Sequence, residues 1–197
     1  MKHLAVIFAG GLLVVPSAQA GELKGKVQSW NGSQPAVVWI EGALKFDPPT
    51  ETPSVVQHKG AFSPSFLVVV AGQTVEMPNQ DLVAHNVYSK SPAKQFDLGY
   101  YAMGEHKQVT FDKPGLIELG CSIHQFMRGR ILVVPNPYFA VLDPDGGFTI
   151  RNLPAGDYVL KFWSGDGAEV ARRVKVPSSG ATVVNLELTA NQLAVRK

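Results

Sequence analysis

The sequence predicts an all-β fold, on three observations. Short runs rich in β-branched and aromatic residues recur along the chain, separated by Gly, Pro, Asn and Asp. Segments such as Pro114-Gly115 and Asp145-Gly146-Gly147 carry the residues that tight turns require. No window of useful length shows an apolar face at helical spacing between capping residues. Many short strands with regular turn signals are typical of a sandwich or barrel.

The first twenty residues, 1–20, predict a secretory signal peptide. A short polar start precedes the apolar run 4–15, which is too short to span a bilayer, and Ala18-Gln19-Ala20 is a small-x-small cleavage site. The alternative is an uncleaved membrane anchor, which the short run and the lack of stop-transfer charges after it disfavour. We therefore expect a periplasmic protein that starts at Gly21 and has no membrane span after cleavage.

The predicted strands fall into three groups separated by two proline-rich breaks, Asp47–Pro53 and Pro135-Asn136-Pro137. In chain order, the strands are 25–28, 36–41, 66–70, 74–77, 85–88, 108–111, 116–119, 130–134, 147–151, 157–163, 168–176 and 181–188. We expect residues 55–135 to form one domain, inserted into a discontinuous domain of residues 21–46 with 138–190. The alternatives are one elongated sandwich, or a small N-terminal hairpin packed on the middle domain.

Charge and cysteine content narrow the classes of function. The formal net charge is +2, which is no electrostatic footprint for nucleic acid. Cys121 is the single cysteine, so an exported chain cannot form an internal disulfide. Its thiol is then free, linked to another molecule, or a metal ligand. We expect a monomer.

Four side chains predict metal chemistry. Cys121, His124 and Met127 offer a thiolate, an imidazole and a thioether within seven residues, and His85 offers a second imidazole at a predicted strand end. Two imidazoles and a thiolate with a weak thioether are the donor set of a blue-copper electron-transfer site. Taken singly, Cys121 could be a small buried apolar residue and Met127 core filler. Their combination at this spacing favours the metal site.

The stretch from residue 66 to residue 134 resembles the cupredoxin family, and within it the amicyanin type and cupredoxin-like proteins linked to methylamine utilisation. The resemblance rests on Leu67-Val68-Val69, Gly72, Val75, Asn79, His85-Asn86-Val87, Phe111 and the sequence Cys-x-x-His-x-x-Met-Arg-Gly at 121–129. It implies a Greek-key β-sandwich with one type 1 copper ion, in which His85, Cys121 and His124 are equatorial ligands and Met127 is axial. It also implies that Asn86 ties the His85 strand to the cysteine loop. Ile123 and Gln125 stand where amicyanin-type loops carry proline, so this loop has two further backbone donors.

The flanking segments resemble a different family. Residues 143–160 resemble the regulatory domain of carboxypeptidases, with an aspartate-glycine turn, an aromatic residue, a proline-alanine-glycine turn and a tyrosine strand in that order. Residues 23–39 resemble its opening strands. This implies a second, smaller β-sandwich of the transthyretin or carboxypeptidase-regulatory kind, with Trp30, Trp39 and Trp163 in its core.

The sequence therefore predicts a periplasmic type 1 copper protein that transfers single electrons between redox partners, such as a c-type cytochrome or a dehydrogenase. The alternative is a copper-binding, structural or recognition module without redox turnover. We do not expect an enzyme, because nitrite-reductase or multicopper-oxidase chemistry needs further histidine pairs. The chain has five histidines, and His58 and His106 lie in polar, loop-like surroundings typical of the surface. His85 should be buried, and one edge of His124 should be exposed beside Leu82, Met103, Ile123 and Phe126.

Overall fold

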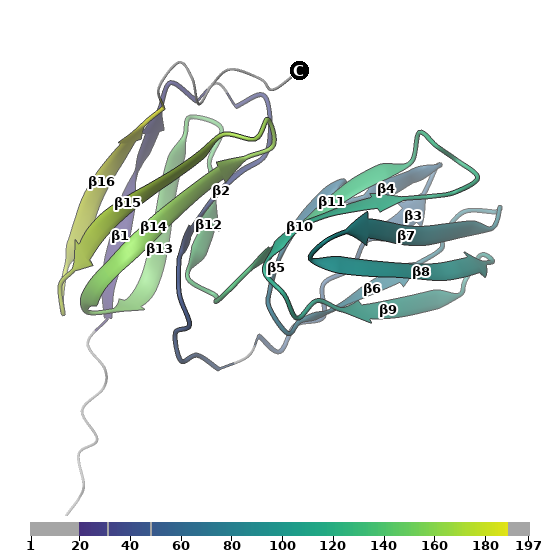
Figure 1. Ribbon diagram of the computed structural model, residues 1–197, viewed down its shortest axis with the longest axis horizontal. Coiled ribbons are helices and arrows are strands. Elements are labelled where there is room, and N and C mark those ends of the chain that lie inside the picture. Colours follow the sequence, from purple (N-terminus) through teal and green to yellow (C-terminus); the bar gives the residue numbers. More distant parts are fainter. Residues whose placement is uncertain (1–19, 31, 48, 189–197) are drawn as a thin grey trace, which may run out of the picture.

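The computed structural model describes residues 20–30, 32–47 and 49–188, and within them all regular structure is β-strand (Figure 1). The all-β prediction is confirmed. The predicted signal peptide lies outside the described residues, apart from Ala20. No helix in the described ranges is long and apolar enough to cross a membrane.

The strands are β1 (Ala20–Gln28), β2 (Ala36–Ile40), β3 (Val56–His58), β4 (Ala61–Ser63), β5 (Phe66–Val70), β6 (Thr74–Pro78), β7 (His85–Ser91), β8 (Lys94–Tyr101), β9 (His106–Thr110), β10 (Gly115–Gly120), β11 (Arg128–Val134), β12 (Phe139–Val141), β13 (Gly147–Pro154), β14 (Gly156–Ser164), β15 (Glu169–Val176) and β16 (Ala181–Glu187).

Strands β3 to β11 build one lobe, to the right in Figure 1. Its largest sheet has the order β5-β11-β10-β7-β8, and the pairs β6-β9 and β3-β4 form two further small sheets. β5 runs parallel to β11, whereas the other neighbours in the large sheet are antiparallel. Alternate residues of β10 and β11, such as Ile117, Leu119, Ile131 and Val133, enter one apolar core. Cys121 and Met127 belong to the same core.

Strands β1, β2 and β12 to β16 build the other lobe from the two flanking segments of the chain. One sheet has the order β13-β1-β16 and the other β12-β2-β14-β15. β1 lies parallel to β16 and antiparallel to β13, so the N-terminal segment is the central strand of its sheet. Leu23, Ile40, Ile150 and Phe162 are fully buried between the two sheets. The division into two separately folding domains stays a prediction.

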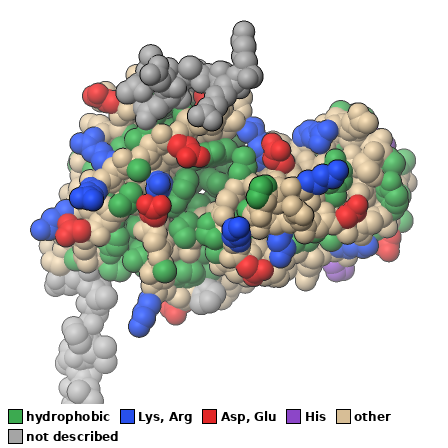
Figure 2. All heavy atoms as spheres, viewed as in Figure 1, with side chains coloured by type: hydrophobic (Ala, Val, Ile, Leu, Met, Phe, Trp, Pro, Cys, Tyr) green, Lys and Arg blue, Asp and Glu red, His purple; other side chains and the backbone are tan. Residues whose placement is uncertain are grey.

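A third apolar cluster joins the two lobes. It contains Val37 and Trp163 from the flanking lobe and Val70, Leu132 and Val134 from the middle lobe. The rings of Trp163 and Phe66 stack with centroids 5.6 Å apart. Apolar side chains line the hollow visible between the lobes in Figure 2. The lobes therefore share a packed interface and not merely two linkers.

The placement of two tryptophans corrects the sequence-based expectation. Trp30 packs against the flanking core as expected, but Trp163 belongs to the cluster between the lobes and Trp39 packs against that cluster. The reason is strand alternation: Val38 and Ile40 face the flanking core, so Trp39 faces the opposite side.

Four strands were not predicted: β3, β4, β8 and β12. β3, β4 and β12 have three residues each, which is too few for a periodic signal. β8 is an edge strand whose half-buried Phe96 and Leu98 alternate with exposed Gln95, Asp97 and Gly99.

Candidate metal centre

Adjacent strand ends bring the predicted ligands together. His85 is the first residue of β7, and Cys121 directly follows β10, the neighbouring strand, where Gly120 pairs with Tyr88. The loop from Cys121 to Met127 then closes through a turn in which the Met127 N–H donates to the His124 carbonyl, at 2.9 Å. β11 begins at the next residue and anchors the far side of the loop.

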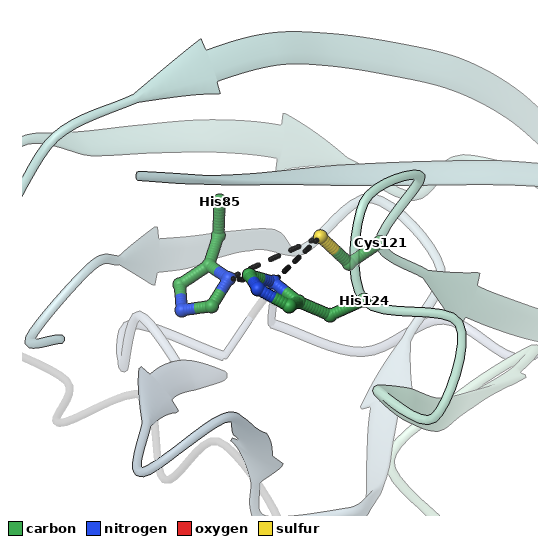
Figure 3. Close-up of side chains that lie close together, drawn as sticks. All are labelled: His85, Cys121 and His124. Atoms are coloured by element: carbon green, nitrogen blue, oxygen red, sulfur yellow. Dashed lines mark hydrogen bonds between the residues drawn. The ribbon is translucent and has the colours of Figure 1, made fainter. Parts of the chain in front are cut away.

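Three donor atoms converge at this end of the lobe (Figure 3). The sulfur of Cys121 lies 3.9 Å from Nδ1 of His85 and 3.8 Å from Nδ1 of His124, and the two Nδ1 atoms are 2.9 Å apart. His85 is fully buried, Cys121 is buried and His124 is half-buried. Among the described residues, no other group of three His, Cys, Asp or Glu side chains brings its ligand atoms this close.

The two sulfur–nitrogen separations fit a metal ion, whereas the 2.9 Å between the two Nδ1 atoms is a hydrogen-bond distance, shorter than the roughly 3.5 Å that two metal–nitrogen bonds at about 120° would give. An ion about 2.05 Å from a ring nitrogen and about 2.3 Å from a thiolate sulfur, with an angle of about 120° between the bonds, places nitrogen and sulfur about 3.8 Å apart. The two sulfur–nitrogen separations match this value. Two imidazoles and a thiolate in a trigonal arrangement are the ligands that select blue copper. His85, Cys121 and His124 are thus positioned as a copper site.

Met127, the predicted axial ligand, is fully buried and packs in the same core as Cys121. Its position three residues after His124 and the turn between them keep it at the base of the loop. The assignment of its sulfur as the fourth ligand stays a prediction.

The amide of Asn86 joins the strand of His85 to the cysteine loop, as the cupredoxin resemblance implied. Its Oδ1 accepts hydrogen bonds from the backbone N–H and the hydroxyl of Ser122, at 2.7 and 3.0 Å. Its Nδ2 donates to Asp97 at 3.1 Å. The Ser122 hydroxyl also contacts the Tyr100 hydroxyl, at 2.8 Å. The loop is therefore held by side chains, although it lacks the prolines of amicyanin-type loops.

Two neighbouring tyrosines have opposite environments. Tyr101 is buried, and burial raises the pKa of its phenol to about 12 although a hydrogen bond from Gln57 acts in the other direction. The phenol donates to the carbonyl of Met77, at 2.7 Å. Tyr100 is exposed.

Asp81 is a site residue that sequence reasoning missed. Its Oδ2 lies 2.9 Å from Nε2 of His85, on the side of the ring opposite the three converging atoms. Burial opposes the charged form, but hydrogen bonds from the backbone N–H groups of Gly60 and Lys59 and from His85 outweigh it, so the pKa of the Asp81 carboxyl lies below its ordinary value. The only sequence feature that could have pointed to Asp81 is its position four residues before His85. In a loop, that spacing does not predict that the two side chains are in contact.

Exposed apolar side chains surround the centre. Most of the large hydrophobic residues that are more than half exposed lie in the loops at this end or, as Tyr100 does, near the end of β8, and Leu82 at 89% and Phe126 at 74% are the most exposed of them. We call this set the copper-end patch: Leu82, Val83, Tyr100, Met103, Ile123 and Phe126. The Phe126 ring lies 5.7 Å from the His124 ring, centroid to centroid. His58 and His106 are exposed, as predicted, and do not belong to the three-residue group of His85, Cys121 and His124.

Comparisons with known proteins agree with the geometry. Residues 54–134 match the model of the family described as copper binding proteins, plastocyanin/azurin family. No curated protein sequence matches the chain.

Similar solved structures include a copper-containing nitrite reductase from Thermus scotoductus SA-01, with 28% identity over 49% of this chain and 25% of the reductase, at a TM-score of 0.42. An amicyanin from Paracoccus versutus has 25% identity over 45% of this chain and 86% of its own, at a TM-score of 0.40. A purple cupredoxin from Nitrosopumilus maritimus has 24% identity over 42% of this chain and 99% of its own, at a TM-score of 0.38. The chain thus spans a quarter of the reductase. Residues 54–134 are therefore similar to copper binding proteins of the plastocyanin/azurin family, and they contain the three converging donor atoms described above.

Proposed function

We propose that the protein carries single electrons between redox partners in the periplasm, after cleavage behind Ala20. One type 1 copper ion, held by His85, Cys121 and His124 with Met127 as the weak axial ligand, would supply a one-electron couple. The observation that carries the proposal is the convergence of one thiolate and two imidazoles beneath an exposed apolar surface. Mass spectrometry of the exported protein tests the localisation. A mass that corresponds to a chain starting at Gly21 would support it, and a mass that includes residues 1–20 would contradict it.

The scaffold suits an electron carrier because little has to move when the electron does. His85 and Cys121 are buried at the ends of paired strands, and Asn86 fixes the loop between Cys121 and His124. His124 is the ligand nearest the surface, so we assign electron entry and exit to its ring edge. A redox partner, such as a c-type cytochrome or a dehydrogenase, would dock on the copper-end patch. Small apolar surfaces suit encounters that must release quickly.

The docking proposal is tested by Phe126→Glu. A charge in the patch beside His124 must be desolvated whenever a partner docks, which we expect to cost about 1–2 kcal/mol and to slow electron transfer about tenfold. Stopped-flow oxidation by a c-type cytochrome measures the rate. The visible spectrum should stay unchanged, because Phe126 is 74% exposed and contributes no ligand atom. Val183→Glu, on an exposed residue of β16, is the matched control and should transfer electrons at the normal rate. Equal rates in all three proteins would refute docking at this patch.

The axial assignment is tested by Met127→Leu. Leucine has nearly the same volume, so the buried core should accept it at a cost below about 1.5 kcal/mol. The bond to an axial thioether is weak and long, so the copper protein should keep its colour and change its reduction potential. Voltammetry of both proteins measures the change. An identical potential would show that the Met127 sulfur is not a ligand.

Reversible voltammetry also separates an electron carrier from a static copper module and from an enzyme. A carrier gives a reversible couple and exchanges electrons with a cytochrome, whereas a static module does not exchange them. Steady-state turnover of nitrite or dioxygen would argue for an enzyme. The proposal expects none, because the described residues offer one three-residue metal group and not two.

A further inference from the structure

The turn between β3 and β4 places a lysine in a backbone conformation that lysine seldom adopts. Lys59 and Gly60 join the two strands, with φ angles of +52° and +68°. Two-residue hairpin turns of this kind need positive φ at both central positions, which favours Asn, Asp and Gly. Lysine at such a position is uncommon and costs free energy, so other contacts must hold the turn.

The carboxylate of Asp81 provides these contacts. It accepts hydrogen bonds from the backbone N–H groups of both Lys59 and Gly60, the latter at 2.8 Å. Asp81 is itself fixed, because its own N–H donates to Oδ1 of Asn79 at 2.8 Å. Asn79 is fully buried and donates in turn to the carbonyls of Val83 and Tyr101. The carboxylate is therefore held in one place by parts of the chain on both sides of it.

The same carboxylate determines which nitrogen of His85 is free. The ionised carboxylate of Asp81 has no proton to donate, so it is the acceptor in its hydrogen bond with His85. Nε2 of His85 is therefore the donor and carries the proton. Nδ1 then presents its lone pair toward Cys121 and His124. Since the two Nδ1 atoms are 2.9 Å apart, His124 is the donor of that hydrogen bond in the metal-free protein. The two imidazoles are thus unequal: Nδ1 of His85 accepts the hydrogen bond between them, and Nδ1 of His124 donates it.

We propose that Asp81 is the positioning residue of the copper site, fixing the tautomer and orientation of His85 while the Lys59-Gly60 turn fixes Asp81. This inference rests on the proposed copper site but not on its electron-transfer role. A carboxylate behind a ligand imidazole makes the imidazole a stronger donor. The turn also lies beside the copper-end patch, because a Cβ atom added at Gly60 would lie 3.4 Å from the Phe126 ring. Asp81 therefore contacts both the proposed ligand His85 and a turn next to the proposed docking surface.

The test compares Asp81→Asn with two further variants. Asparagine has nearly the shape of aspartate but no negative charge. Its NH2 group cannot accept the hydrogen bonds that the backbone N–H groups of Lys59 and Gly60 donate to the carboxylate. Asp112→Asn removes the same charge from an exposed residue paired with Lys94, and serves as the control. Lys59→Gly relieves the backbone at the turn, so that Lys59→Gly/Asp81→Asn keeps the hairpin even if Asp81→Asn alone loosens it.

We expect Asp81→Asn, alone and with Lys59→Gly, to weaken Cu(II) binding about 10- to 100-fold. A tenfold loss confined to oxidised copper raises the reduction potential by about 59 mV. In the metal-free protein, nitrogen NMR should find His85 protonated at Nε2, and its Nε2 proton should exchange faster in Asp81→Asn. Asp112→Asn and Lys59→Gly should match the wild type.

The possible failures are distinguishable. Normal affinity, potential and Nε2 proton exchange in Asp81→Asn would overturn the positioning role and leave the copper site intact. Full recovery in Lys59→Gly/Asp81→Asn would show that Asp81 serves only the turn, and would also overturn it. If the wild type bound no copper, the proposed function would fail, while the NMR measurement on the metal-free protein would still decide the contact between Asp81 and His85.

Discussion

Replacing Cys121 with serine should abolish the intense visible absorption of the copper-loaded protein. The absorption of a blue-copper site arises from charge transfer between thiolate and Cu(II), and a serine hydroxyl at neutral pH offers neither the negative charge nor the soft sulfur. Cys121 is 2% exposed and supplies the only sulfur in the three-residue group. Copper held by His85 and His124 alone would leave the protein nearly colourless.

The control for this experiment is His106→Ala. His106 is exposed and outside the group, so its loss should leave the absorption unchanged. The metal-free Cys121→Ser protein should fold normally by circular dichroism, because the two side chains have similar size. An intense band that survives Cys121→Ser, or disappears in His106→Ala, would show that the colour arises elsewhere.

Truncation of Trp163 should destabilise the protein more than any surface substitution. Its side chain is 6% exposed and stacks on Phe66 across the boundary between the lobes. Truncating a buried tryptophan to alanine removes about 3–5 kcal/mol, and the lost aromatic pair contributes to that value. We expect Trp163→Ala to lose about 3 kcal/mol in the free energy of unfolding, most of it from the contact between lobes.

Calorimetry can show whether the lobes are separate domains. If residues 21–46 with 138–190 fold independently of residues 55–135, Trp163→Ala should uncouple them and give two unfolding transitions. Trp30→Ala, which alters only packing against the flanking core, should lower one stability without separating the transitions. A single cooperative transition in Trp163→Ala would favour one continuous sandwich.

The sequence predicted the strands that carry the site because their signals are strong and local. β5, β10 and β11 are largely apolar runs, and Cys121, His124 and Met127 lie close together in the chain. His85 was found because the donor set of Cys121 and His124 lacked a second imidazole. The structure brings it to Cys121 through strand pairing that the sequence did not show.

The interface and the role of Asp81 could not be predicted in the same way. β2 and the second half of β11 are apolar at almost every position, which indicates burial on both faces but does not say what covers each face. Asp81 acts through backbone N–H groups of a hairpin more than twenty residues earlier. Such contacts depend on tertiary placement and leave no spacing pattern.

Copper titration of the metal-free protein, followed by absorption and then by voltammetry, is the decisive experiment for the copper site. We expect one copper ion per chain, an intense visible band that saturates at that ratio, and a reversible one-electron couple. Stoichiometric binding without the visible band, or a band without a reversible couple, would contradict the assignment of His85, Cys121 and His124 as the ligands of an electron-transfer copper.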